Sequence, residues 1–294
     1  MLYLLLSVIC SAILILHFKF FERNNIPVFQ AIVINYLTAA MCGFLFLPQK
    51  NEIINGAFLS WSWLPVSMML GFMFINVFNL TSLTTITFGV STASVASKLG
   101  LVFPLLFAFI AYHEGFNYIK LAGIGTAVVA VVLSSIKNET TAGNHIAHKT
   151  GILPFLVFVG NGACDSLTQF ANKHYLAHQG NEQFAMFIFV WAGVTGIIVL
   201  IGMYFRRGNT LQWRSILGGI SLGIPNYFSY LFLLKALTGL PWGSSVVFPL
   251  NNLGTVAFAT FGGVVLFKER ISKTNLAGLI AAFVAVILIV ISSR

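Results

Sequence analysis

The sequence predicts an all-α membrane protein of ten transmembrane helices, arranged as two inverted five-helix repeats around a central cavity. Its composition is the first reason for this prediction. Of the 294 residues, 58% are hydrophobic and only 8% are charged, whereas a soluble domain carries about 25% charged residues. So few charges cannot cover a globule in water, and the surrounding solvent must therefore be lipid.

An internal repeat is the second reason. Residues 121–134 recur at 276–289 with eight of 14 positions identical, and each copy begins seven residues after a glutamate, Glu114 or Glu269. The two copies are 155 residues apart, about half of the chain. Two homologous membrane halves are typical of secondary transporters, which bind their substrate between the repeats near the bilayer midplane.

Apolar runs separated by polar segments define the individual helices. A span needs about 20 predominantly apolar residues. Polar breaks stand at 22–27, 48–56, 206–209 and 268–273, and the segment 81–97 is so rich in Ser and Thr that it obscures one boundary. The expected spans are 1–21, 27–47, 61–84, 88–112, 118–137, 150–172, 184–205, 212–236, 240–267 and 273–292.

The longest hydrophilic stretch divides the chain into two sets of five helices. We expect a first repeat at 1–137, a connecting loop at 138–149 and a second repeat at 150–294. Because each half has an odd number of helices, the second inserts upside down relative to the first, and both termini lie on the same side. Two fused halves already supply a paired architecture, so a monomer is the default expectation.

Loop charge bears on which side that is. If the termini are cytoplasmic, the cytoplasmic loops hold five Lys and Arg residues and the opposite loops hold ten. The positive-inside rule therefore favours termini outside the cytoplasm.

Several function classes find no support in the sequence. The net charge is +9, but the basic residues stand singly or in pairs between apolar runs and form no patch for nucleic acid. The three cysteines lie in apolar stretches, and the histidines at 145, 148, 174 and 178 read as solvated residues, so no metal or other cofactor is expected. Neither a catalytic motif nor an ATP-binding loop is present, so we expect no enzyme activity.

Lys98 and Asp165 stand well inside predicted spans, where charge is costly and marks a function or an ion pair. Lys98 lies near the middle of the fourth span and Asp165 within the sixth. Lys98 is a candidate for binding an anionic group. Asp165 is either a proton carrier or the permanent partner of Lys98.

Uncharged polar residues complete the candidate site. On the sixth span Asn161 and Gln169 share a helix face with Asp165, because they are four residues from it on either side. Further candidates follow the two prolines of the eighth and ninth spans, where a ring frees backbone groups that need partners, or lie on the third span. These substrate-binding candidates are Asn226, Tyr227, Tyr230, Asn251, Asn252, Asn76 and Asn79.

Two stretches carry a resemblance to a known family. The segment from Ser94 to Pro104 with Glu114, and the segment from Phe248 to Asn252 with Glu269, are each followed by Leu-Ala-Gly. In this order they resemble the drug/metabolite transporter superfamily, in its EamA-like branch of ten-helix proteins. The resemblance implies a cavity built from spans 1, 3, 4, 6, 8 and 9, peripheral spans 5 and 10, and cytoplasmic termini, which conflicts with the loop charge.

The resemblance also bears on the substrate. In sugar-phosphate and nucleotide-sugar relatives a lysine of the fourth span faces the anionic group, and Lys98 is similar in place and type. The ninth span here offers Asn251 and Asn252 in place of a second cation. This departure disfavours a doubly charged phosphate relative to a carboxylate or zwitterion.

The function that follows is secondary active export of a small polar metabolite, such as an amino acid or organic anion, by alternating access coupled to protons or to exchange. We expect a multi-pass protein of a prokaryotic inner membrane, whose partners are a small-molecule substrate and the lipid bilayer. One alternative is a multidrug exporter of hydrophobic or cationic compounds, in which Lys98 and Asp165 are structural. The alternative of another class is a membrane-embedded enzyme or scaffold.

Overall fold

Long apolar helices make up the molecule. The computed structural model describes residues 1–47, 50–103, 118–135, 152–175, 181–207, 210–239, 244–269 and 271–292, and these residues form no strand. Helices of the first half are α1 (Leu2–Arg23), α2 (Val28–Phe46), α4 (Leu64–Phe88), α5 (Val90–Lys98) and α7 (Tyr118–Ser135), with short turns at α3 (Asn51–Ile54), η1 (Ala57–Ser60) and η2 (Leu99–Leu101). Those of the second half are α9 (Ile152–Tyr175), α10 (Asn181–Arg207), α11 (Trp213–Gly239), α12 (Ser244–Phe267) and α13 (Lys273–Ser292).

Within the described residues, seven helices are long and apolar enough to cross a membrane: α1, α2, α4, α10, α11, α12 and α13. Their outer faces expose large apolar side chains, among them Phe261 at 68% and Leu266 at 61%. In water such a surface would drive aggregation, so lipid must cover it. The chain is thus an α-helical membrane protein, as its composition predicts.

Three of the ten expected spans are not among the seven, for different reasons. In α9, polar residues such as Asn161 and Asp165 lower the hydropathy of an otherwise sufficient length. In α7 the described side chains form an apolar segment, Leu121–Ala130, that is shorter than a full span. The expected helix 88–112 is α-helical over Val90–Lys98, tightens to the 3-10 turn η2, and is α-helical again at 102–103; from residue 104 it lies outside the described residues.

The obscure boundary in the Ser- and Thr-rich segment falls at Gly89, whose φ of 91° ends α4 and redirects the chain into α5. Such a conformation favours glycine, which lacks a Cβ. By contrast, the helix continues through Pro225 in α11 and through residue 249 in α12. The main departures from α-helix therefore flank α5 at Gly89 and η2, and not the two prolines.

Helix packing follows a regular scheme. Each helix of the first half has a counterpart about 155 residues later: α1 and α9, α2 and α10, α4 and α11, α5 and α12, α7 and α13. The helix α1 packs on α11 and α12, and its counterpart α9 packs on α4 and α5. Likewise α2 packs on α11 as α10 packs on α4, and the pairs α7–α13, α5–α12 and α2–α10 each join two counterparts.

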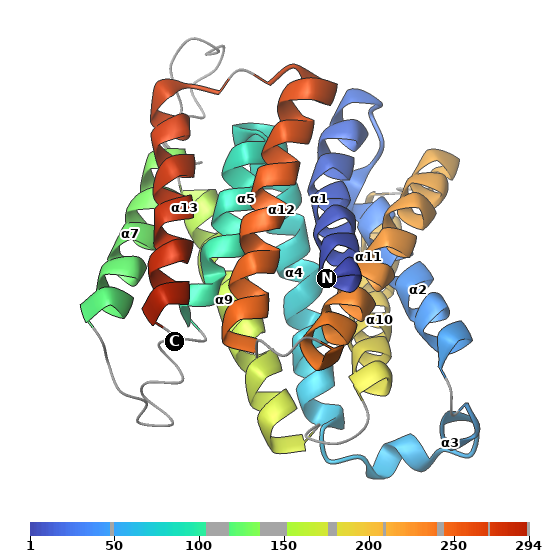
Figure 1. Cartoon of the computed structure of the whole chain (residues 1–294). Helices are drawn as coiled ribbons and strands as arrows, with labels where there is room; N and C mark the ends of the chain where they lie inside the picture. The colour runs from blue at the N-terminus through green and yellow to red at the C-terminus, as the bar shows by residue number, and fades with distance from the viewer. Residues whose placement is uncertain are drawn as a thin grey trace.

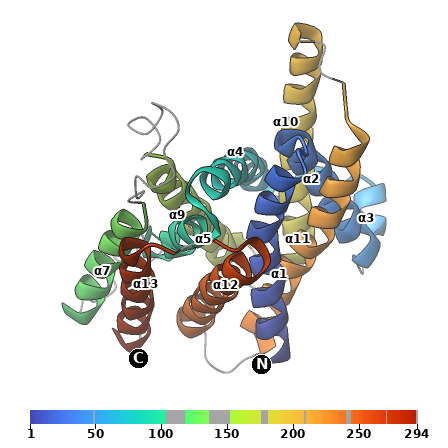
Figure 2. The same cartoon turned by 90° about the horizontal axis from the view of Figure 1, so that it is seen from above.

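Most of these contacts therefore join one half to the other. Figures 1 and 2 both place α7 beside α13 at one edge of the molecule, with α5, α9 and α12 next to them. Two main apolar cores result: one links η2, α7, α9, α12 and α13, and the other links α1, α2, α4, α10 and α11. The candidate site residues stand on helices of both cores, Lys98, Asp165 and Asn252 on helices of the first and Tyr230 on a helix of the second.

Candidate functional site

Lys98 is the last residue of α5, at the change to 3-10 helix, and its side chain is only half-buried. Its backbone carbonyl accepts a hydrogen bond of 3.1 Å from Nδ2 of Asn252 on α12. This bond joins α5 to its counterpart α12 at the lysine itself. It also satisfies a carbonyl that the end of the α-helix leaves without an intrahelical partner.

Asp165 lies on α9 near ionisable groups of two other helices. Its charge interacts with Lys98 on α5 and with Tyr230 on α11. Asp165 is nevertheless exposed at the surface of the protein. Because a carboxylate cannot face hydrocarbon cheaply, an exposed aspartate with a lysine nearby marks this side of α9 as a candidate site.

The lysine and the aspartate form no salt bridge. Among the described residues, the ion pair in direct contact is Lys19 with Glu22, both on α1. Lys98 and Asp165 are thus close enough to feel each other's charge but keep their hydrogen-bonding atoms free for another partner. Two opposite charges that form no salt bridge inside a membrane protein could bind a ligand with a charged group.

A close backbone contact sets the distance between the two helices. A Cβ at Gly100 would lie 2.7 Å from the backbone N of Gly162 on α9. Since Lys98 is two residues before Gly100 and Asp165 three residues after Gly162, the contact holds both charged residues near one crossing point. Small residues serve this purpose widely in membrane helices.

Aromatic rings border this region on the α11 side. Tyr230 lies edge-on to Phe189, at 6.2 Å between ring centroids, and Phe189 stacks on Tyr36 at 6.2 Å. Tyr36 in turn donates a 3.0 Å hydrogen bond to the carbonyl of Phe74 and contacts Phe78. These rings from α2, α4, α10 and α11 form a mainly aromatic wall, of which Tyr230 is the member that interacts with Asp165.

The two asparagines of α12 differ. Asn252 is engaged with Lys98, as described, whereas the Oδ1 atom of buried Asn251 has no hydrogen-bond partner in the structure. A small cavity of about 10 Å³ adjoins Lys98 and Asn252, which is room for one water at most. On this side of Lys98, then, the conformation is closed to a metabolite.

Other candidate residues lie apart from the charged pair or make bonds of their own. Asn226 donates a 3.1 Å hydrogen bond to Oδ1 of Asn35 and thereby fastens α11 to α2. Tyr227 is buried and stacks on Phe46. The amides of three further candidates bond to carbonyls four residues earlier in their own helices: Asn76, Asn79 and Asn161.

Of these residues Asn76 is exposed and Asn79 and Asn161 are half-buried, while Gln169 is exposed one turn beyond Asp165. The structure thus brings Lys98, Asp165, Tyr230 and Asn252 together. It gives Asn226 and Tyr227 interhelical packing contacts. Residues 138–149, including two of the loop histidines, lie outside the described residues.

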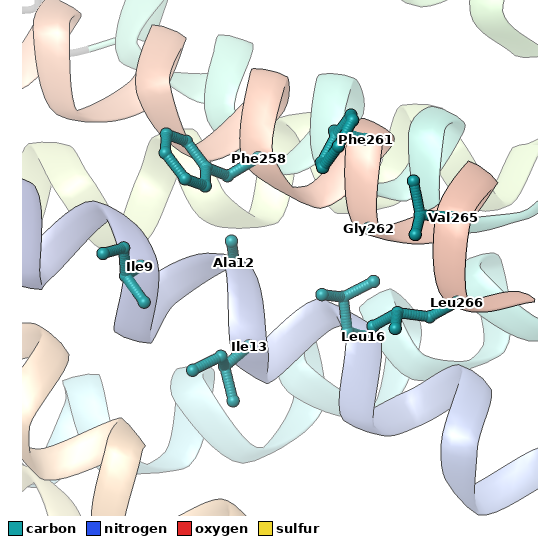
Figure 3. A pocket seen from close by; sticks show the side chains of 9 residues that line it. All are labelled: Ile9, Ala12, Ile13, Leu16, Phe258, Phe261, Gly262, Val265 and Leu266. Carbon is teal, nitrogen blue, oxygen red and sulfur yellow. The ribbon is translucent and has the colours of Figure 1, made fainter.

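A larger pocket lies elsewhere, on the outer face of the molecule. A groove of about 230 Å³ runs between α1 and α12 and is lined by apolar side chains and Gly262 (Figure 3), with Ile9, Leu16, Phe258 and Phe261 among them. Several of these side chains belong to the lipid-facing surface. A groove without polar groups cannot orient a polar substrate, so this groove is not a candidate for the substrate site.

One residue with a clear structural role was not a candidate from the sequence. Glu269 follows α12, and both of its carboxylate oxygens lie 3.0 Å from the backbone N of Val90, the first residue of α5. The repeated glutamate motif did single out its position, but its partner is 179 residues away. Glu114, the corresponding glutamate of the first half, lies outside the described residues.

Comparisons with known proteins add the following. No protein-family model matches the chain. A protein of Haemophilus influenzae (strain ATCC 51907 / DSM 11121 / KW20 / Rd), described as uncharacterized, is 29% identical over 288 residues, which cover 96% of this chain and 95% of that protein. A solved crystal structure, described only as that of a protein, matches with a TM-score of 0.62 at 15% identity, over 100% of this chain and 96% of the other. The second match shows that an experimentally determined protein has a similar fold along its whole length.

Proposed function

We propose that this chain is a secondary active transporter of the drug/metabolite transporter superfamily, in its EamA-like branch, and that it exports a small polar metabolite across a prokaryotic inner membrane. The proposed architecture is ten spans in two inverted five-helix repeats. The packing scheme supports this, because exchanging each helix with its counterpart maps the contacts of α1 onto those of α9, and those of α2 onto those of α10.

The observation that carries the proposal is that two opposite charges, on α5 and α9, lie near each other without forming a salt bridge. Lys98 and Asp165 belong to different halves, interact electrostatically and make no salt bridge with each other. In this proposal Lys98 binds the anionic end of the substrate, an amino acid or organic anion. Asn252 and Tyr230 contact the remainder, and Asp165 carries the coupling proton or the charge that exchange requires.

Alternating access supplies the mechanism. The halves rock about the site, so that it opens to one side of the membrane at a time. A site at the contact between halves is well placed for this motion, because Lys98 and Asp165 move relative to each other when α5 and α9 shift. The closed space of about 10 Å³ beside Lys98 is consistent with a conformation that seals one side.

A transport assay tests the proposal. Purified protein in proteoliposomes loaded with radiolabelled amino acids and dicarboxylates is expected to release one of them down its gradient, and Lys98→Ala is expected to abolish the release. Lys273→Ala is the matched control, because Lys273 is an exposed lysine at the start of α13. Full activity of Lys98→Ala, with folded yield unchanged, would refute the role of the lysine.

The aromatic wall favours a second candidate function, which is export of hydrophobic or cationic compounds. Tyr36, Phe189 and Tyr230 offer ring faces on which planar cations stack. In that case Lys98→Arg is expected to be fully active, and cationic dyes are expected to be moved in the same assay while dicarboxylates are not.

A further inference from the structure

At one end of the molecule, a glutamate of the second half is bonded to the helix that carries Lys98. The Glu269 carboxylate accepts the Val90 N–H through both oxygens at 3.0 Å, and the Ser91 backbone contributes a further bond. Val90 begins α5, whose other end is Lys98. A carboxylate is favourable there because the first amides of a helix lack intrahelical acceptors and carry partial positive charge.

Two glycines form the niche that receives this carboxylate. A Cβ at Gly89 would lie 3.1 Å from Oε2 of Glu269, and a Cβ at Gly263 would lie 3.0 Å from the same atom. One glycine ends α4 in the first half, and the other belongs to α12 in the second. The side chain therefore sits between the halves, where any larger residue would press on it.

Further polar contacts at this end also cross between the halves. Arg23, at the end of α1, donates a hydrogen bond to the carbonyl of Phe267 and lies over the Phe267 ring. Gln30, in the first turn of α2, donates to the carbonyl of Thr210 and accepts from the N–H of Gln212. Because a short turn joins α1 to α2, these contacts lie at one end, and all of them must loosen if the halves part there.

We infer that Glu269 is a latch that holds this end of the molecule closed and releases the first turn of α5 when the halves rock. The inference rests on the proposed alternating access. The latch is directly connected to the site, because the helix that Glu269 holds carries Lys98 eight residues after Val90. Releasing Val90 frees α5 to move relative to α12 and α9.

The charges around the latch make it respond to pH. Lys19 and Glu22 on α1 interact with Glu269, Arg23 is bonded close by, and Lys268 is an exposed neighbour in sequence. Burial raises the pKa of the Glu269 carboxyl above its ordinary value, while the Val90 N–H and Lys19 oppose the rise. Since an open end would return the group to water, the closed end binds the proton more tightly, and closure is favoured by acidification.

Distance measurements between spin labels test the latch. Cysteines at Asn24, after α1, and at Lys273, at the start of α13, place one label on each half, in a background where Cys10, Cys42 and Cys164 are alanine. Glu269→Ala is expected to raise the long-distance fraction at least twofold and to speed amide exchange of Val90 at least tenfold. Glu22→Gln is the control for loss of charge alone, because Glu22 interacts with Glu269 through its charge but forms its ion pair within α1.

Equal distance distributions in Glu269→Ala and the unsubstituted protein, or an equal change in Glu22→Gln, would overturn the latch. Glu269→Gln covers the case in which the alanine variant does not fold, because its amide oxygen still accepts from Val90 without a charge. The long-distance fraction of the unsubstituted protein is expected to rise with pH, and that of Glu269→Gln to stay constant; the same rise in both would also overturn it. These distances are measured without substrate, so their outcome is independent of the transport assay.

Discussion

At the residue scale, Lys98 and Asp165 are distinguished by what they lack, which is a salt bridge to each other. If Lys98 binds an anionic group, the ammonium must reach a defined point, and a planar guanidinium is no substitute there. We predict that Lys98→Arg lowers transport about tenfold or more, as expected when a charged hydrogen bond worth about 1.5–3 kcal/mol is misplaced.

The same variant is expected to melt close to the unsubstituted protein, and the measurement is transport rate beside melting temperature. An equally active Lys98→Arg would point to a structural lysine and to the drug-export alternative.

Asn226 supports a prediction about stability. Its amide donates to Oδ1 of Asn35 between α11 and α2, and both side chains are buried. Asn226→Ala leaves that oxygen unpaired, and we expect a loss of about 1 kcal/mol. Asn76→Ala is the matched control, since Asn76 is exposed and bonds only within its own helix. Similar melting temperatures for the two variants would argue against the interhelical bond.

Part of the site follows from the sequence and part does not. A lysine and an aspartate inside apolar runs are conspicuous because charge in lipid is costly. The bond between Asn226 and Asn35 joins residues 191 apart, and nothing in either local segment indicates it. Sequence reasoning therefore marks Asn226 as a polar residue that needs a partner, but it does not say whether that partner is a substrate or another helix.

At the element scale, the crossing of α5 and α9 decides where the two charges lie. A methyl group at Gly100 would meet the backbone N of Gly162 at 2.7 Å, and backbone cannot move aside as a side chain does. We predict that Gly100→Ala costs about 1–3 kcal/mol and also weakens transport, because it separates Lys98 from Asp165.

Gly125→Ala is the control for this substitution. No atom lies within 4 Å of a Cβ at Gly125 on α7, and alanine is the better helix former by up to about 1 kcal/mol. A Gly100→Ala protein that melts as high as Gly125→Ala would show that the crossing is loose.

Glu269 supplies a prediction about pH and stability. The pKa of its carboxyl is raised in the folded state by burial, so protonation favours folding. The stabilisation that comes from this protonation is absent in Glu269→Gln. It is fully present below the pKa of the carboxyl in the unfolded chain, about 4.3, and is lost as pH rises through the raised pKa of the folded state. The melting temperature of the unsubstituted protein minus that of Glu269→Gln should therefore fall with rising pH and then level off. If this signed difference instead rises with pH, the hydrogen bonds to the carboxylate outweigh burial in setting the pKa of Glu269.

At the scale of the whole molecule, hydropathy predicts the helices well and their interruptions poorly. The described helices match the expected spans to within a few residues at most ends, because lipid imposes a uniform length and apolar character. The turn at Gly89 depends on a carboxylate 180 residues later in the chain, which no local pattern encodes. The two prolines, which do stand out locally, leave their helices unbroken at the backbone level.

The central claim is that the space between Lys98 and Asp165 is a substrate site, and ligand-induced stabilisation tests it most directly. Purified protein and Lys98→Ala would be heated with amino acids, dicarboxylates, sugar phosphates and cationic dyes, each in excess; this requires no knowledge of transport direction or coupling. A ligand at about 100 times its dissociation constant stabilises by roughly 2.7 kcal/mol. The account predicts that an amino acid or dicarboxylate raises the melting temperature of the unsubstituted protein and leaves Lys98→Ala unchanged. Stabilisation of both proteins alike, or by cationic dyes alone, would contradict it.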